Sequence, residues 1–315
     1  MRKALVVGIN DYPGAPLKGC VNDATAIASM LEANGDGSPN FEVKRMTQPG
    51  VQITRSSLRE AIERLFGGEC DIALFYFSGH GLIGSTGGYL VTPDYKKHDE
   101  GILMDQILSL ANHSKAKNKV VIFDCCHSGA FGTPKITDSA VAQLSEGLSV
   151  LTASRDSESA LEVNGCGIFT SLVVDALRGG ASDLRGHITP GSIYAYVDQA
   201  LGAWDQRPIF KTNITRFVSL RTIPPPVPLA KLRLLCTYFQ KPQHEYRLDP
   251  SYEFTDTRKN DTNVAIFKDL QKYESVGLVI PVGEEHMYFA AMNSKTCRLT
   301  ALGYHYWRLI NEKRI

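Results

Sequence analysis

The stretch VVIFDCCHSG, residues 120–129, places two adjacent cysteines at the end of an apolar run. The four residues VVIF are all β-branched or aromatic, which predicts a buried strand, and the polar residues that follow predict a loop at its end. A cysteine in this position has three roles open to it: ligand to a metal, small apolar packing residue, or nucleophile. The remaining residues of the chain decide between them.

The composition is that of a globular protein with one large or two ordinary domains: 315 residues, 43% hydrophobic, 21% charged, with a net charge of +1. This balance gives no reason to expect binding of nucleic acid or of a membrane surface. No apolar run approaches the roughly 18 residues that cross a bilayer, and MRKALVVGIND at the start lacks a cleavage pattern and predicts a first strand. The seven cysteines include no CxxC pair, so we expect neither zinc nor disulfides and a reducing, cytoplasmic location.

Apolar strands alternate with helices from residue 1 to about 220. Strands are predicted at 3–10, 71–81, 119–129 and 148–155, and helices at 23–35, from Thr54 or Ser56 through Leu65, at 104–113 and at 167–180. Asn22 or Asp23 is the predicted cap of the first helix. Strands that are apolar throughout, alternating with helices, predict an α/β three-layer sandwich with a mostly parallel sheet.

Residues 223–230 contain four prolines in five positions and predict a semi-rigid linker between domains at 1–222 and 231–315. The second domain is predicted to contain a helix ending near Gly277, a hairpin over 278–300 with charged and polar turns, and a terminal amphipathic helix. Helix, hairpin and helix in this order are typical of the latter half of a winged-helix module. We therefore expect a small winged-helix-like α+β domain.

Two predicted strands end in glycine-flanked polar residues, FYFSGHG with His80 and FDCCHSG with Cys126. Functional residues of doubly wound sheets gather beyond the carboxyl ends of the strands, so His80 and one cysteine meet there if the strands are neighbours. An imidazole beside a thiol raises the thiolate population and later protonates the leaving group. Side chains alternate along a strand, so Asp124 and Cys126 share one face and Cys125 takes the other. This predicts Cys126 as the nucleophile and Cys125 as a packing residue.

Five ordered motifs resemble those of the caspase-like cysteine peptidases, closest to the metacaspases and their prokaryotic relatives. They are KALVVGIN, GCVNDA (19–24), YFSGHG (76–81), DCCHSG (124–129) and ASRDSESALE…GIFTSLVVDAL (153–177). The resemblance covers roughly residues 1–220, and the absence of the QACxG box favours the metacaspase branch over caspases proper. It implies His80 and Cys126 as the catalytic dyad, with the backbone N–H groups of Cys126 and Gly81 as oxyanion donors.

The resemblance also implies an acidic pocket for the substrate residue that precedes the cleaved bond. Its members in this chain are Asp124, Asp23, Cys20 and Ser78. Two carboxylates that converge on one slot favour a guanidinium or ammonium group, so cleavage after Arg or Lys is expected. Structural alternatives exist for both acids: Asp23 as a helix cap, and Asp124 as a strand-end residue that bonds loop amides.

Calcium-dependent metacaspases carry a further acidic cluster, and the matching positions here include Asp94 and Asp105. Met104 replaces one member of a carboxylate pair, and Ca²⁺ takes about six to eight oxygen ligands. We therefore do not expect calcium dependence, and we predict no metal or other cofactor. Asp94 is then an ordinary loop residue and Asp105 a residue of a helix start.

These observations together predict a cysteine endopeptidase that cleaves proteins after Arg or Lys. Prokaryotic relatives with such fusions serve in regulated cell-death or antiviral defence systems, a setting that only the resemblance implies. Residues 231–315 carry 13 Lys and Arg against 10 Asp and Glu, too small an excess for a concentrated basic face. We expect this domain to bind an activator or partner protein, not nucleic acid. The alternative is a DNA- or partner-binding regulator that uses an inactive caspase-like scaffold.

Overall fold

A computed structural model describes the chain except for residues 85–86, 97–98, 126–143, 154–161, 164 and 202–207. The chain divides into two compact units, Met1–Ile223 and Pro224–Ile315. The division falls at the proline-rich segment, where residues without a backbone N–H donor cannot extend a helix or a central strand.

The first unit is built on a six-stranded sheet with the strand order β12-β8-β7-β3-β1-β2. Five strands run parallel, and β12 pairs antiparallel with β8 at one edge. The bounds are β1 Arg2–Gly8, β2 Glu42–Thr47, β3 Ile72–Ser78, β7 Asn118–Asp124, β8 Leu148–Thr152 and β12 Ile209–Asn213. The central strand β3 is buried at every residue, as its continuous apolar sequence requires. The predicted mostly parallel sheet is confirmed.

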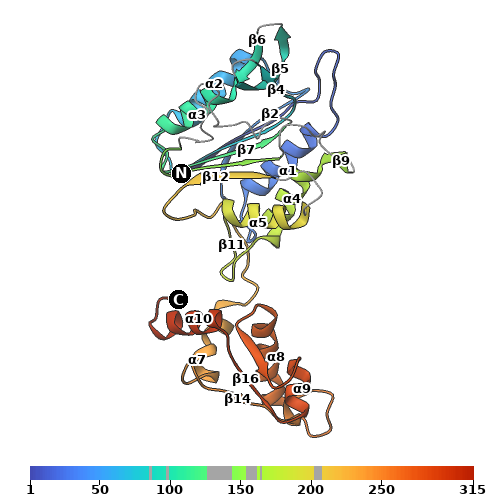
Figure 1. The fold of residues 1–315 in the computed structure, drawn as a ribbon, viewed down its shortest axis with the longest axis vertical. Coiled ribbons are helices and arrows are strands. Elements are labelled where there is room, and N and C mark those ends of the chain that lie inside the picture. The colour runs from blue at the N-terminus through green and yellow to red at the C-terminus, as the bar shows by residue number, and fades with distance from the viewer. Residues whose placement is uncertain (85–86, 97–98, 126–143, 154–161, 164, 202–207) are drawn as a thin grey trace. The chain divides into compact units, whose positions relative to one another are not determined.

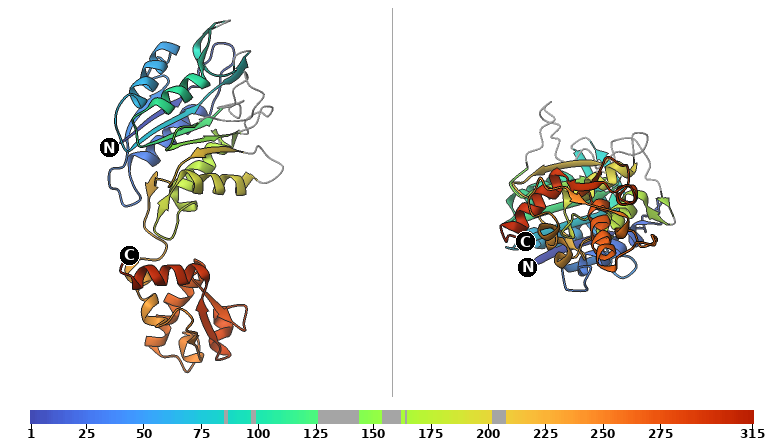
Figure 2. Two further views of the ribbon diagram at one scale, coloured as in Figure 1. Left: turned by 60° about the vertical axis from the view of Figure 1, so that its left-hand side comes forward. Right: turned by 90° about the horizontal axis from the view of Figure 1, so that it is seen from below.

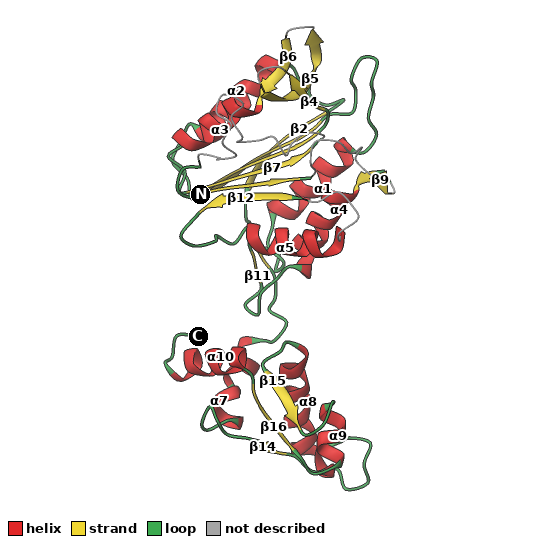
Figure 3. Cartoon of the chain, in the orientation of Figure 1, coloured by secondary structure: helices red, strands yellow, loops and turns green. Residues whose placement is uncertain are grey.

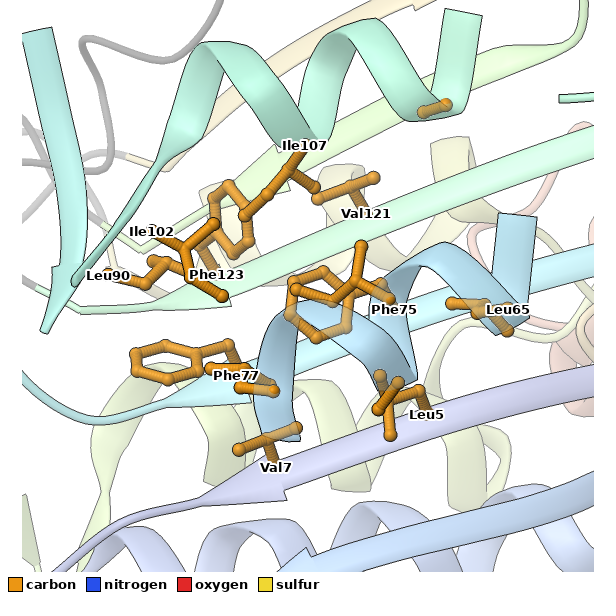
Figure 4. Packing of buried hydrophobic residues seen from close by; sticks show 14 of the residues in the cluster. Leu5, Val7, Leu65, Phe75, Phe77, Leu90, Ile102, Ile107, Val121 and Phe123 are labelled. Atoms are coloured by element: carbon orange, nitrogen blue, oxygen red, sulfur yellow. The ribbon is translucent and has the colours of Figure 1, made fainter. Parts of the chain in front are cut away.

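Helices cover both faces of this sheet (Figure 1). One face packs against α2 (Arg55–Phe66) and α3 (Met104–His113), and the other against α1 (Cys20–Glu32), α4 (Ile168–Asp175) and α5 (Pro190–Leu201). Because side chains alternate along a strand, each strand contributes to two separate apolar clusters. Figure 4 shows the cluster under α2 and α3, with Phe75 and Phe77 of β3 beside Val121 and Phe123 of β7. Figure 2 shows the layers from two further directions.

The helix boundaries test the predicted caps. Helix α3 has the predicted bounds, and Thr54 caps α2 by accepting a hydrogen bond from the Ser57 N–H. The cap predicted for the first helix is wrong, because α1 begins at Cys20 after Gly19. Asp23 therefore lies inside the first turn, where helical rotation turns its side chain toward the sheet. Helix α4 ends earlier than predicted, at Asp175, and a π-helical turn (η2) follows over Ala176–Gly180.

A three-stranded antiparallel sheet follows His80 and was not predicted. It consists of β4 (Gly81–Gly84), β5 (Gly87–Lys96) and β6 (Asp99–Leu103) in the order β4-β5-β6. Its sequence is rich in glycine and contains a proline in β5, features that predict turns instead of strands. Further short pairings join β9 (Glu162–Val163) to β10 (Cys166–Gly167) and β11 (His187–Ile188) to β13 (Arg221–Thr222).

The second unit is a small α+β domain (Figure 3). Its elements are α6 Leu229–Arg233, α7 Leu235–Tyr238, β14 Tyr246–Arg247, η3 Pro250–Tyr252, α8 Asp261–Ser275, β15 Val279–Val282, α9 Met287–Met292, β16 Thr296–Leu299 and α10 Ala301–Asn311. Strands β15 and β16 form the predicted antiparallel pair. Helix α9 lies between them, where polar turns were predicted, because Met287, Ala290 and Ala291 bury one helical face. Helix α6 begins inside the predicted linker, and the winged-helix identity of the unit stays a prediction.

Among the described helices, none is both long enough and apolar enough to cross a bilayer.

Candidate active site

The predicted site residues collect at one edge of the large sheet. Strands β3 and β7 are parallel neighbours, and Ser78 pairs in register with Asp124. His80 follows the end of β3 by two positions, and Cys126 follows the end of β7 by two positions. Cys126 lies outside the described residues, so the predicted dyad is represented here by His80 alone. Cys125 is buried in the cluster under α2 and α3, which confirms its predicted packing role.

The imidazole of His80 is oriented by a backbone carbonyl. Nε2 lies 2.8 Å from the Ala15 oxygen. A carbonyl can only accept, so Nε2 carries the proton, and in the neutral ring Nδ1 is the basic nitrogen. An imidazole in this tautomer can take a proton at Nδ1 from a thiol or give one to a leaving amine.

Tyr12 holds the turn that carries His80. Its hydroxyl accepts from the His80 N–H at 3.1 Å and donates to the Val91 carbonyl at 3.2 Å. The two rings meet edge to face with centroids 4.6 Å apart. Tyr12 and Ala15 are not among the predicted site residues. The signal for them is weak, since only the sequence YPGA after the first strand indicates a turn there.

Position 79 has room only for a glycine, because a larger side chain would collide with its neighbours. A methyl group on Gly79 would collide with the Tyr12 hydroxyl and would lie 2.9 Å from the Phe77 ring. The Gly79 N–H donates to the Asp124 carbonyl at 3.3 Å, which ties this turn to the end of β7. Gly81, the second glycine of the motif, opens β4 opposite Leu90. Its predicted role as an oxyanion donor stays a prediction.

Two buried carboxylates converge on the α1/α4 side of the same edge. Asp23 is 2% exposed and Asp124 is 7% exposed. A methyl group on Gly167 would lie 2.8 Å from Asp124 Oδ2 and 3.3 Å from Asp23 Oδ2, so both acids border the same glycine. The sequence-predicted pair is thus brought together, and Gly167 is a neighbour that was not predicted.

Asp23 accepts hydrogen bonds from three residues in two strands, β3 and β10. The Gly167 N–H donates to Oδ1 at 3.0 Å, and the Ser78 hydroxyl donates to Oδ2 at 3.1 Å. The Cys166 thiol also bonds this carboxyl group. Ser78 is therefore in direct contact with Asp23, whereas Cys20 is buried one helical turn before it. These hydrogen bonds, and not capping of α1, explain the orientation of the Asp23 side chain.

Asp124 is held through a buried chain of hydroxyls. Thr170 Oγ1 donates to Asp124 Oδ2 at 2.6 Å, and Tyr76 Oη lies 2.5 Å from Thr170 Oγ1. Since the single proton of Thr170 goes to the carboxylate, Tyr76 must be the donor to Thr170. Neither Thr170 nor Tyr76 was predicted, because inside a helix and a strand they are indistinguishable from packing residues.

Burial raises the pKa values of both acids. Desolvation, followed by repulsion from Asp124, raises the pKa of Asp23 to about 7, against the opposing effect of its hydrogen bonds. Desolvation raises the pKa of Asp124 to about 6, against the effect of the Thr170 hydrogen bonds. A pair of carboxyl groups that is costly to ionise without a counter-ion is suited to bind a cationic group.

The two further acids considered for calcium lie apart from this pair. Asp94 is in β5, not in the predicted loop, and its carboxylate accepts from the Arg55 N–H at 3.0 Å at the start of α2. Asp105 is in the first turn of α3, as expected. Within the described parts of the chain, no group of three or more His, Cys, Asp or Glu residues is arranged to hold a metal ion.

Comparisons with known proteins agree with this architecture. The sequence matches the family model of the caspase domain over residues 1–219. Protein GSU0716 from Geobacter sulfurreducens superposes with a TM-score of 0.52 at 18% identity, covering 71% of this chain and 100% of its own. Caspase-1 from Spodoptera frugiperda superposes with a TM-score of 0.50 at 13% identity, covering 70% of this chain and 90% of its own.

No curated protein matches the sequence. The two structural likenesses establish a shared fold, and the family model spans nearly all of the first unit. The chain belongs to the caspase-domain family of cysteine peptidases.

Proposed function

We propose that this protein is a cysteine endopeptidase that cleaves after Arg or Lys through a His80/Cys126 dyad, as metacaspases do. The observation that carries the proposal is the buried pair of Asp23 and Asp124 beside the strand ends that lead to His80 and Cys126. An acidic substrate side chain would be repelled by this pair. A guanidinium or ammonium group would supply a counter-charge to the pair.

The chemistry follows from the orientation of His80. Nδ1 takes the proton of the Cys126 thiol, and the thiolate attacks the carbonyl carbon after the basic residue. Backbone N–H groups of Cys126 and Gly81 stabilise the oxyanion. His80 then gives its proton to the leaving amine, and water hydrolyses the thioester with His80 as the base. The Ala15 carbonyl stabilises the imidazolium that forms at each transfer.

Short peptides that differ only in the residue before the cleaved bond test this proposal. Peptides with Arg or Lys are expected to exceed the Asp peptide by at least about a hundredfold in kcat/KM, since facing like charges cost several kcal/mol. Cys126→Ala and His80→Ala are expected to lower the rate by at least about a thousandfold. Cys125→Ala is the matched control and retains activity. Preferential cleavage after Asp, or full activity in Cys126→Ala, contradicts the proposal.

The second unit, Pro224–Ile315, is proposed to recruit a protein activator or substrate in a prokaryotic cell-death or defence setting. Large apolar side chains are exposed on it, among them Tyr288 and Phe289 of α9 and Tyr304 of α10, which supports a protein partner over nucleic acid. The double variant Tyr288→Ser/Phe289→Ser is expected to lose the cellular effect while purified enzyme still cleaves a short Arg peptide. An unchanged cellular effect contradicts this role.

A further inference from the structure

A pocket of about 360 Å³ opens beside His80 on the side of the edge away from the carboxylate pair. Its walls include Tyr12 and Pro13 from the loop after β1, Leu82 from β4, and Val91, Pro93 and Tyr95 from β5. His80 and Gly81 form the boundary nearest the predicted reacting centre. The unpredicted small sheet after His80 thus builds one wall of a concave surface at the site.

The pocket and the carboxylate pair lie on opposite faces of the large sheet. Tyr12 belongs to the apolar cluster under α2 and α3, and Val91 packs against that cluster. Ser78 and Asp124 contact Asp23 of α1 and Thr170 of α4, on the other face. A peptide whose basic side chain enters the acidic pocket, and whose leaving amine reaches His80, therefore continues past the imidazole toward this second pocket.

We propose that this pocket binds the side chain of the residue that follows the cleaved bond, and that it selects an apolar or aromatic one. The inference rests on the proposed function, because the direction of the peptide is set by cleavage after a basic residue and by proton transfer from His80 to the amine. It adds a second point of recognition, on the leaving-group side, to the acidic pocket.

The chemistry of the walls favours an apolar occupant. No residue that lines the pocket carries a carboxylate, an ammonium or a guanidinium group, and every one of them is described. The Tyr12 hydroxyl is occupied by its bonds to the His80 N–H and the Val91 carbonyl, so Tyr12 presents its ring. The nearby carboxylate of Asp94 is bound to the start of α2 and is not part of the lining. Apart from the His80 imidazole, which the proposed reaction uses for proton transfer, a charged side chain would find no charged partner among these residues and would lose its water.

The pocket is also connected to the base. The Val91 N–H donates to the His80 carbonyl at 3.0 Å, and Tyr12 bridges the same two residues. The wall and the imidazole are therefore fixed with respect to each other. An occupant that fills the pocket places its own backbone nitrogen against His80, so its effect is expected in kcat/KM and not in binding alone.

Internally quenched peptides that share one sequence up to Arg and differ only in the next residue test the proposal. Leu or Phe after Arg is expected to give kcat/KM at least about tenfold above Gly or Asp, because burial of one large apolar side chain is worth at least that factor. Equal rates for Leu, Phe, Gly and Asp, or a preference for Gly or Asp, overturn the subsite and leave cleavage after Arg standing. Failure to cleave any Arg or Lys peptide overturns both proposals.

Variants locate the effect in the pocket. Leu82→Ala is expected to lower the ratio of the Leu peptide to the Gly peptide about threefold or more, since it removes most of one apolar wall. Leu110→Ala, in a groove between α2 and α3, is the matched control and keeps the wild-type ratio. Tyr95→Ala, on the exposed rim, gives a second reading if Leu82→Ala does not fold. A ratio that stays at the wild-type value in both Leu82→Ala and Tyr95→Ala overturns the assignment.

Discussion

The two sides of the sheet edge hold their polar groups by different means. On the α1/α4 side, Asp23 and Asp124 are almost fully buried and depend on hydroxyl, thiol and amide donors. On the α2/α3 side, His80 is half-buried and is held by the Ala15 carbonyl and the Tyr12 hydroxyl, both neutral. The two buried carboxylates thus lie on the side proposed to recognise the basic residue of the substrate. Activity is therefore expected to depend on charge and pH at the carboxylate side, and on the positioning of the imidazole at the His80 side.

Among substitutions that keep the proposed dyad, the largest effect is expected from Asp124→Asn, which keeps the shape of the side chain and removes the charge. The loss of one partner of a buried charge pair costs about 2–5 kcal/mol, so kcat/KM for Arg peptides falls by about a hundredfold or more. Steady-state kinetics measure this. Asp105→Asn, a partly buried carboxyl group on the other face, is the control. A loss of less than threefold would show that Asp124 does not take part in substrate recognition.

Gly167→Ala tests whether the positions of the two acids matter, because it displaces them without changing their charge. The added methyl group would lie 2.8 Å from Asp124 Oδ2, closer than side chains approach, so the carboxylates must shift. A drop of about tenfold in kcat/KM for Arg peptides is expected. Gly68→Ala is the control, because a methyl group there meets only Lys3 Nζ at 3.9 Å. Equal activity of the two variants would show that the spacing of the carboxylates is not critical.

Tyr12→Phe probes the other side of the edge. It removes the acceptor of the His80 N–H and the donor to the Val91 carbonyl while keeping the ring. Loss of these two hydrogen bonds weakens the positioning of the His80 turn by about 1 kcal/mol or more, so kcat is expected to fall about fivefold or more with KM little changed. Tyr194→Phe, at a partly buried tyrosine of α5 on the other face of the sheet, serves as the control. A rise in KM at constant kcat would place Tyr12 in substrate binding instead of in support of the base.

The pH dependence of substrate binding separates the two sides further. Burial raises the pKa values of Asp23 and Asp124 to about 7 and about 6. A cationic side chain binds the ionised pair, so below pH 7 its binding must displace a proton. KM for an Arg peptide is expected to rise by about tenfold or more between pH 8 and pH 6, because the ionised fraction of a group with a pKa of about 7 falls about tenfold over this interval. A KM that is constant over this interval would contradict the coupling.

The same shifts predict a smaller effect on folding. A carboxyl group with a raised folded-state pKa stabilises the fold fully below its unfolded pKa, and that stabilisation is lost as the pH rises through about 6 to 7. Asp23→Asn removes one such group, so its Tm relative to the wild type is expected to be higher at pH 8 than at pH 5. Thermal unfolding at the two pH values measures this. A Tm difference that is the same at both pH values, or one of the opposite trend, would contradict the cost of ionising Asp23 in the folded state.

Much of the first unit could be predicted because its local signals agree with its tertiary structure. Strands β3 and β7 each contain a continuous apolar run and are buried on both faces, and Thr54, one of the two predicted candidates, caps α2. The assignment of Cys125 to packing needed only strand alternation. The convergence of Asp23 and Asp124 was expected from the resemblance to metacaspases, since residues 101 positions apart carry no local sign of contact.

The remaining features depend on contacts between distant parts of the chain. Asp23 has the sequence context of a helix cap, but α1 begins one turn earlier than predicted, at Cys20. The side chain of Asp23 is instead buried against β3 and β10. Tyr76 and Thr170 lie in a strand and a helix that are largely apolar, so the hydrogen bond between them cannot be predicted without the fold. The small sheet after His80 is not predicted from the sequence, because its strands contain glycines, whose conformational freedom is typical of loops.

The atom that orients His80 belongs to the main chain, and this has a genetic consequence. Side-chain replacement at Ala15 cannot delete a carbonyl oxygen, so a scan of point substitutions is expected to score this position as tolerant although it fixes the tautomer of the proposed base. Only changes in the path of the chain, such as a deletion within the YPGAP turn, remove the contact. The tautomer of His80 is therefore encoded by loop length, a property that single-residue substitutions do not sample.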